Sequence, residues 1–147
     1  PIFVDIYTIN DDGNLIDASA LAAVAALKSA VLPELVDDKV QWGVFTKTKV
    51  PLKFEPINVT VYKVGKSLII DAGRDEEAAT DARLSVSVSE TGSVHAMQKG
   101  GSTGMSLDEV DKAIGLAIKA VKPLRDALKW KWLNMKKQDL LVLELYN

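Results

Sequence analysis

The residues best suited to chemistry lie in an acidic stretch between two hydrophobic segments, residues 71–83, which reads DAGRDEEAATDAR. Its carboxylates could coordinate Mg²⁺, since hard cations take oxygen ligands, but their spacing alone does not establish a metal site. Adjacent Glu76 and Glu77 would point apart in an extended loop. Polar connections between strands are usually solvated, so residue types alone favour an exposed loop over a site. The charged members of the stretch are Asp71, Arg74, Asp75, Glu76, Glu77, Asp81 and Arg83.

Three other features could carry chemistry, and each has a simpler interpretation. The glycine-rich loop 100–104 precedes an expected helix, and helix N-termini bind anions. It lacks the Lys-Ser/Thr pair of a nucleotide-binding loop, so a turn followed by a helix cap is favoured. His95 is the only histidine and there is no cysteine, so the chain cannot build a zinc site alone. Ser102 and Ser106 have no identifiable base to activate them as nucleophiles.

Composition limits the class of protein. The chain has 147 residues, a net charge of −2 and 48% hydrophobic residues, which fits one globular domain with a real core. It has no overall positive charge to attract nucleic acid, so RNA binding would need a local patch or a partner. Disulfides and thiol catalysis are excluded. No apolar run is long enough to cross a bilayer. Because the chain starts at Pro1 and enters an apolar segment at once, we expect a fragment of a longer protein.

The first fifty residues are expected to supply one strand, one helix and a less regular connector. Ile2–Ile9 is apolar and β-branched, which predicts a buried strand. Residues 11–14 form a turn by composition, and Asp17 is expected to cap a helix that runs to about Ala30. That helix is alanine-rich and apolar almost all round, so we expect it to be buried on several sides.

The connector at 33–50 is difficult to assign from sequence. Trp42 and Phe45 are expected to pack, and Lys47 and Lys49 to share one face of a strand. A pair of lysines at that spacing is more typical of a solvated face than of an RNA contact.

The second part predicts a hairpin and a meander. Residues 57–62 alternate apolar and polar side chains, the period of a half-buried strand, and 68–70 returns after a tight turn at Gly65. Residues 84–88 and 94–98 continue an antiparallel meander with one wet, serine-lined face.

The last helix begins at the capping-box pair Ser106 and Glu109, and Pro123 is expected to bend or interrupt it. Four basic residues, Lys112, Lys119, Lys122 and Arg125, lie largely off its apolar stripe. In the tail, residues 129–132 alternate basic and aromatic side chains, for which packing of a tryptophan is favoured over stacking on RNA bases. The apolar run 139–146 is expected to pair or dock.

The stretches at 11–27, 56–88 and 95–114 together resemble the second half of an RNase PH-type domain. Within that superfamily, they resemble the non-catalytic ring subunits of archaeal exosomes, from Ile2 to about Leu128. The resemblance implies an α+β fold of mixed or antiparallel sheets packed with helices, without the first half of the domain. It implies three regions: 1–50, the end of the first subdomain; 51–128, the second subdomain; and 129–147, a tail without a counterpart.

The resemblance also allows two tests of catalysis. Catalytic relatives hold phosphate with a Gly-Thr-Arg triplet, and the matching positions here are Asn14, Leu15 and Ile16. Leucine and isoleucine offer neither a hydroxyl nor a guanidinium to an anion. Catalytic relatives also place two aspartates six residues apart, and the ungapped match gives Glu77 and Arg83. Arginine reverses the charge that a general acid or metal ligand needs. Asp81 as the second acid would be too close to Glu77.

The resemblance therefore implies a subunit that is not itself an enzyme, with no catalytic residue, no cofactor and no metal in this chain. Its implied partners are a catalytic RNase PH-like homologue in a hetero-oligomeric, six-membered ring, and RNA that the partner degrades 3′ to 5′ by phosphorolysis. A membrane is not implied, and the expected location is the cytoplasm. Exposed apolar surface leaves self-association of the fragment open.

Two alternatives remain at this point. One is an active phosphate-dependent 3′–5′ exoribonuclease of the same fold, in which Glu77 and Asp81 do the acid work. The other is a stand-alone binding domain.

Overall fold

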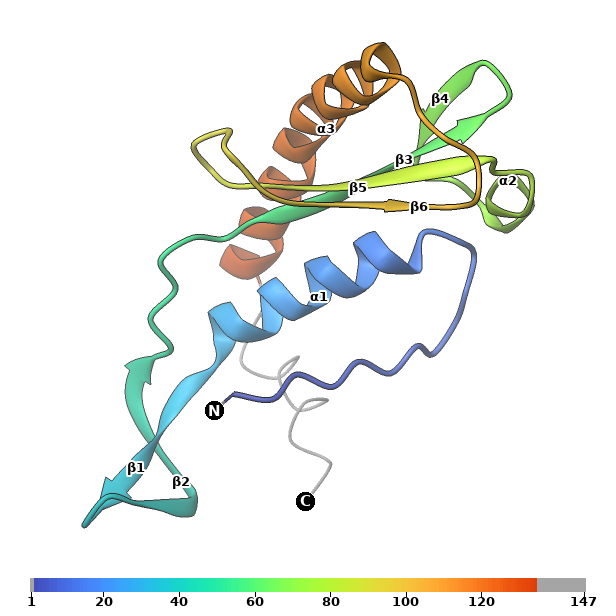
Figure 1. The fold of residues 1–147 in the computed structure, drawn as a ribbon. Helices are drawn as coiled ribbons and strands as arrows, with labels where there is room; N and C mark the ends of the chain where they lie inside the picture. Colours follow the sequence, from blue (N-terminus) through green and yellow to red (C-terminus); the bar gives the residue numbers. More distant parts are fainter. Residues whose placement is uncertain (1, 135–147) are drawn as a thin grey trace.

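The computed structural model describes residues 2–134, and these form an α+β fold as the sequence predicts. A four-stranded antiparallel sheet lies between two long helices, and a separate two-stranded hairpin projects away from it (Figure 1). The elements in chain order are α1 (Leu15–Ser29), β1 (Val31–Val36), β2 (Lys39–Lys49), β3 (Ile57–Val64), β4 (Ser67–Ile70), α2 (Arg74–Ala78), β5 (Ala82–Val88), β6 (Val94–Gly100) and α3 (Leu107–Asn134).

The strand order of the main sheet is β4-β3-β5-β6, with every neighbouring pair antiparallel. The strands follow the predicted segments closely, but they do not form a simple meander. After β4 the chain crosses through the acidic stretch and α2 and returns to the other edge of β3, where Val61 is paired with Leu84. β3 is therefore a central strand, and the crossover lies at the end of the sheet.

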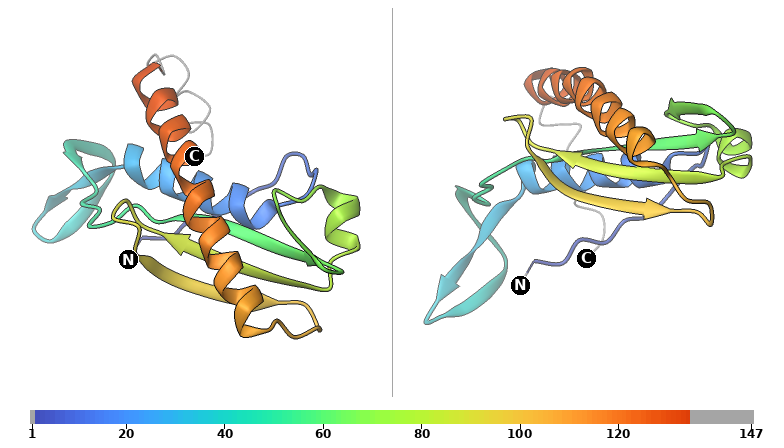
Figure 2. Two further views of the ribbon diagram at one scale, coloured as in Figure 1. Left: turned by 90° about the horizontal axis from the view of Figure 1, so that it is seen from above. Right: turned by 45° about the horizontal axis from the view of Figure 1, so that its top comes forward.

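α3 covers one face of this sheet and forms the apolar core with it (Figure 2). The alternating apolar side chains of β3 and β5 point toward α3, whose small residues allow close approach. No buried side-chain polar atom in the described residues lacks a hydrogen-bond partner. The core residues are Ile57, Val59, Val61, Leu84, Val86, Val88, Ala113, Ala117 and Val121.

The other face of the sheet is polar, but it is not the wet face that the serine pattern predicts. α1 packs against β3 on this side, so Asn58, Thr60 and Tyr62 are buried together with the apolar residues between them. Ser85 is buried as well, and its hydroxyl lies 2.8 Å from the Thr60 hydroxyl. β3 is thus buried on both faces, whereas its sequence period predicted burial on one.

Two predictions for the first fifty residues are wrong. Ile2–Ile9 forms no strand and is exposed, because within the described residues no strand lies beside it to pair with its backbone groups. Trp42 and Phe45 do not pack: they are 92% and 66% exposed on β2, since β1 and β2 pack mainly against each other. Lys47 and Lys49 lie on exposed positions of the same strand.

The helices also differ from expectation in detail. α1 begins at Leu15, its N-cap is Asn14, and none of its residues is fully buried. α3 begins with the predicted capping box, in which Ser106 and Glu109 exchange hydrogen bonds, but Pro123 does not interrupt it.

Arg125 of α3 was expected to lie off the apolar stripe of the helix, but it faces the sheet. It donates to the carbonyl oxygens of Glu55 and Val88 and is mostly buried, so it fastens the helix to the sheet. The expectation for the apolar run 139–146 lies outside the described residues, as does the side-chain packing expected around residues 130–132. Within residues 2–134, no helix is both long and apolar enough to span a membrane.

Candidate functional site

The acidic stretch contains a short helix, α2, and two of its five carboxylates accept hydrogen bonds from backbone N–H groups. Glu76 accepts a hydrogen bond from the Gly73 backbone N–H at 2.9 Å and so caps α2. Asp81 accepts one from the Gly65 backbone N–H at 2.8 Å and so holds the β3–β4 turn. These bonds give Glu76 and Asp81 a structural role. Across residues 2–134, no three acidic, histidine or cysteine side chains are grouped as metal ligands.

Glu77, at the first of the two matched acid positions, is held by a tyrosine. The buried Tyr62 hydroxyl donates to Glu77 Oε1 at 2.7 Å and lies 3.1 Å from Asn14 Oδ1. Burial, and then the hydrogen bond to Glu77, raises the pKa of Tyr62 well above its usual range, so the hydroxyl stays protonated. The tyrosine therefore joins the acidic stretch to the start of α1.

The matched phosphate-binding positions lie beside this tyrosine. Asn14 has a left-handed backbone (φ 51°), and its side-chain amide donates to Asp71 Oδ1 at 3.1 Å. Asp71 is left-handed too (φ 56°), a conformation that asparagine and aspartate tolerate better than other side chains. Leu15 and Ile16 then open the helix with apolar side chains. Hydrogen bonds of Asn14 and Tyr62 thus join the start of α1 to the acidic stretch.

Arg83, at the second matched acid position, lies on β5 on the same sheet face as Tyr62. It is paired across the strands with Tyr62 on one side and Gly100 on the other. Its side chain is exposed and forms no hydrogen bond or ion pair within the described part of the chain. A cation therefore stands where the resemblance expects a carboxylate.

Asp17 has a role that the sequence did not indicate. Instead of capping α1, its carboxylate points at β3 and accepts from Asn58 Nδ2 at 2.6 Å, from the Thr60 backbone N–H at 2.7 Å and from the Thr60 hydroxyl at 2.7 Å. β4 pairs with β3 only from Val61 onward, so this strand edge has no neighbour at Thr60. Asp17 replaces the missing strand there. The one hint in the sequence is that Asp17 lies in the first turn of α1 and that β3 carries polar side chains.

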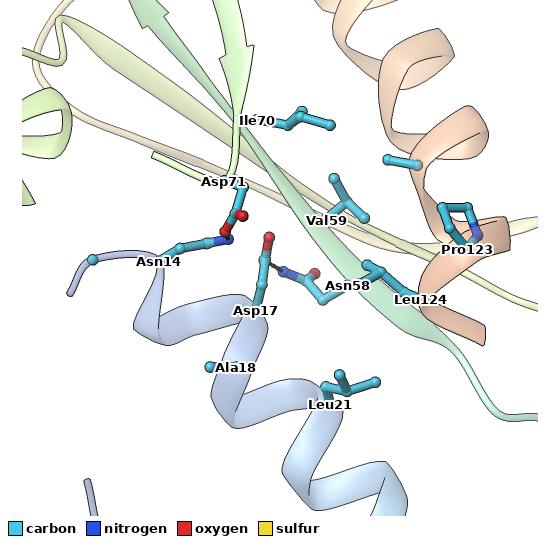
Figure 3. A pocket seen from close by; sticks show the side chains of 12 residues that line it. Asn14, Asp17, Ala18, Leu21, Asn58, Val59, Ile70, Asp71, Pro123 and Leu124 are labelled. Atoms are coloured by element: carbon cyan, nitrogen blue, oxygen red, sulfur yellow. Dashed lines mark hydrogen bonds between the residues drawn. The ribbon is translucent and has the colours of Figure 1, made fainter. Parts of the chain in front are cut away.

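A cavity of about 400 Å³ lies next to Asp17, between α1, the free edge of β3 and the middle of α3 (Figure 3). Its walls are mostly apolar, and its polar groups are the side chains already engaged with one another. The lining residues are Gly13, Asn14, Asp17, Ala18, Leu21, Asn58, Val59, Ile70, Asp71, Ala120, Pro123 and Leu124. The lining contains no cation, so the cavity does not suit a phosphate.

The remaining candidates fit their simpler interpretations. Gly101 in the glycine loop has a positive φ, and a side chain there would meet the Asp81 carbonyl, so the loop makes a tight turn against the strand. The His95 ring lies 4.8 Å from the Phe54 ring at the surface. Ser106 caps α3, where its hydroxyl accepts a hydrogen bond from the Glu109 backbone N–H at 3.2 Å.

Comparison with known proteins shows which family the chain resembles. Residues 55–120 match domain 2 of the 3′ exoribonuclease family. The chain is 40% identical over 131 residues to the exosome complex component Rrp42 of Thermococcus gammatolerans, covering 86% of this chain and 48% of the relative. It is 41% identical over 136 residues to Rrp42 of Sulfurisphaera tokodaii, covering 90% and 49%. The chain spans about half the length of the curated relatives it matches.

Solved structures give the same result. The Archaeoglobus fulgidus exosome with RNA bound to the active site contains a chain that matches with a TM-score of 0.70 and 32% identity, over 81% of this chain and 45% of the other. An archaeal exosome core matches with a TM-score of 0.71 and 31% identity, over 82% and 47%.

Proposed function

We propose that the chain is part of a non-catalytic exosome ring subunit, because residues 55–120 match domain 2 of the 3′ exoribonuclease family and the chain resembles the C-terminal half of the exosome component Rrp42. In this role it supports the 3′ to 5′ phosphorolytic degradation of RNA by a homologous catalytic subunit. Its own contribution is architectural: it completes the ring beside the partner's site and helps to hold RNA. The assembly acts in the cytoplasm.

The observation that carries this proposal is the state of the matched catalytic positions. Leu15 and Ile16 present apolar side chains where a phosphate would need a hydroxyl and a guanidinium. Glu77 is held by the Tyr62 hydroxyl, and Arg83 has the wrong charge for an acid. Phosphate would therefore have no binding group, and the reaction no second carboxylate. No catalytic residue, cofactor or metal ligand is assigned to this chain.

The exposed apolar surface supports a role within an assembly. The segment 2–9 exposes large apolar side chains along its length, and so does the β1–β2 hairpin, with Leu35, Trp42 and Phe45 among the most exposed. Exposed large apolar side chains that are concentrated on two segments in this way are typical of interaction surfaces. We assign it to contacts with the rest of the subunit and with the ring partner, and without them to self-association.

We further assign the regions as the sequence suggested. Residues 51–128 form the second RNase PH-type subdomain, which contains the four-stranded sheet and most of α3. Residues 1–50 end the first subdomain, and 129–147 form a tail. The family match at 55–120 supports the second region.

The test is phosphate-dependent degradation of a short, unstructured RNA by the protein as it is encoded, alone and mixed with its catalytic homologue. We expect no nucleoside diphosphates from the protein alone and steady release from the mixture. A mixture in which the homologue lacks its catalytic acid is the matched control and should release none. Native mass spectrometry of the same mixture should show a ring that contains both chains.

Either of two results would overturn the proposal. Phosphate-dependent release by the protein alone would mean that Leu15, Ile16 and Arg83 are wrongly matched to the catalytic positions. Failure to assemble with the homologue would favour a stand-alone binding domain instead.

A further inference from the structure

The α1 side of the main sheet is covered only in part. α1 packs chiefly against β3 and also covers Ser85 of β5, whereas Arg83 and most of β6 are exposed beside it. Strand register places two short rows of side chains there. One row runs along β5 and the other along β6, with Ser85 opposite Gln98 and Arg83 opposite Gly100. A hollow of about 370 Å³ lies between these strands and α1, where Ile16 forms part of its wall.

Gly100 provides the space in which the Arg83 side chain lies. A Cβ at Gly100 would be 2.8 Å from Arg83 Nε and 3.1 Å from both Cγ and Cζ. The arginine therefore crosses the neighbouring strand in direct contact with its backbone. A long side chain that is already supported loses less conformational entropy when it binds a ligand.

Arg83 differs from the other arginines of the chain. Arg74 faces Asp11, with Nε 3.8 Å from Oδ2, and Arg125 is fastened to two backbone carbonyls. Within residues 2–134 the Arg83 guanidinium forms no hydrogen bond or ion pair, and the carboxylate of Glu77 on the same side accepts the hydrogen bond of Tyr62. The open face thus offers a cation whose donors remain available.

The hollow begins at Ser85, two residues along β5 from Arg83. Its lining carries hydroxyl, amide and apolar side chains, with no carboxylate and no aromatic ring. A guanidinium binds phosphate through paired, charge-assisted hydrogen bonds, while hydroxyls and amides suit a sugar-phosphate backbone. Without a ring on which a base could stack, such a face would bind RNA independently of sequence.

We propose that Arg83, supported by Gly100 on the open face of β5 and β6, binds a backbone phosphate of single-stranded RNA. This inference rests on the proposed function for its ligand, and it adds a contact residue and the chemical group that the residue holds. Because the net charge of the chain is −2, such contacts must be local, and one arginine makes a measurable share of them.

The experiment measures binding of a 5′-labelled, unstructured oligoribonucleotide by fluorescence anisotropy over a range of salt concentrations. It uses the encoded protein alone and, separately, its ring with a catalytically inactivated homologue. Arg83→Ala should weaken binding roughly tenfold. The slope of log affinity against log salt should become shallower by about 0.7, the value for one phosphate contact on a single strand.

Three matched variants separate charge from position. Arg74→Ala removes an exposed arginine elsewhere and should leave both affinity and slope unchanged. Arg83→Lys keeps the charge without the planar fork and should fall between wild type and Arg83→Ala. Gly100→Ala keeps the guanidinium but forces it to move, and should weaken binding in the same direction as Arg83→Ala.

The outcomes are distinct from those that test the ring. Unchanged affinity and slope for Arg83→Ala would overturn this inference even if the ring assembles. A lower yield of ring for Arg83→Ala by native mass spectrometry, with normal RNA binding by the ring that forms, would also overturn it and assign Arg83 to a protein carboxylate. If the wild-type ring does not assemble, the proposed function fails, while the anisotropy of the protein alone still tests the arginine.

Discussion

The two faces of the main sheet are held by different forces. The face toward α3 is a continuous apolar core in which β-branched strand residues contact alanines of the helix. The face toward α1 is joined by hydrogen bonds, with Asp17, Asn58 and Thr60 at their centre. Burial against α3 is non-directional and tolerates small shifts, whereas hydrogen bonds fix α1 in one position on β3.

The difference explains where function is placed. The matched catalytic positions and the open strip of β5 and β6 all lie on the polar face, where the position of α1 decides what is exposed. The apolar face carries none of the matched catalytic positions. Changes on the two faces should therefore differ both in size and in kind.

The largest effect is expected in the apolar core. Ile57 is 1% exposed at the start of β3, so Ile57→Ala should lower the free energy of unfolding by about 3 to 4 kcal/mol through lost burial and a residual cavity. Denaturant unfolding followed by circular dichroism measures it. Ile9→Ala is the control, because that side chain is fully exposed and its loss should change stability by less than about 0.5 kcal/mol. Equal effects at the two sites would contradict the assignment of the core.

The second effect breaks the polar face. Asp17→Ala leaves the Thr60 N–H, the Thr60 hydroxyl and the Asn58 amide without their acceptor, so it should lower the free energy of unfolding by about 2 to 3 kcal/mol. Hydrogen exchange at the Thr60 amide should accelerate as well. Asp75→Ala, an exposed acid on α2, should do neither. If Asp17→Ala is as mild as Asp75→Ala, packing rather than hydrogen bonding holds α1.

The third effect is smaller and depends on pH. Tyr62→Phe removes a hydrogen bond to Glu77 and should lower the free energy of unfolding by about 1 to 1.5 kcal/mol at neutral pH. Because the pKa of Tyr62 is raised in the folded state from its ordinary 10.0, unfolding releases the proton more readily above pH 10. The wild type should therefore lose stability as the pH rises above 10, and the variant should lose less. Parallel curves for the two proteins in alkaline denaturation would refute this.

The smallest effect concerns the exposed start of α3. The hydrogen bond from Lys63, and then the Ser106 backbone N–H, hold the pKa of Glu109 below its ordinary 4.5. A lowered pKa contributes stability above the unfolded value and loses it as the pH falls through the folded one. Glu109→Gln should therefore flatten the loss of stability below about pH 4.5, measured by acid denaturation. A steeper loss in the variant would show that Glu109 does not stabilise the helix start.

The strands of the main sheet and the capping box of α3 could be predicted because their signals are local. Alternation over 57–62 and 84–88 identifies strands whatever they pair with, and Ser106 with Glu109 identifies a helix start. The resemblance picked out Asn14, Glu77 and Arg83 one by one, but it did not predict that Tyr62 would hydrogen-bond to both Asn14 and Glu77.

The features that could not be predicted depend on distant neighbours. Ile2–Ile9 has the composition of a strand, but a strand forms only where another strand supplies its hydrogen bonds. Thr60 and Ser85 were expected to be solvated, because no neighbouring residue in the sequence indicates that α1 covers them. Arg125 read as a surface charge, although two backbone carbonyls far along the chain accept its hydrogen bonds. In each case the structure of the residue depends on a segment that is distant from it in the sequence.

The central position of β3 also has a consequence for the order in which the chain folds. β3 and β4 form a local hairpin, and such hairpins close within microseconds. The opposite edge of β3 must wait for β5, which follows only after the acidic crossover and α2. During synthesis on the ribosome, an apolar strand with one unpaired edge would therefore be exposed until about residue 88 has emerged. The charged crossover delays closure, but it also places repelling, soluble groups next to the segment most prone to aggregate.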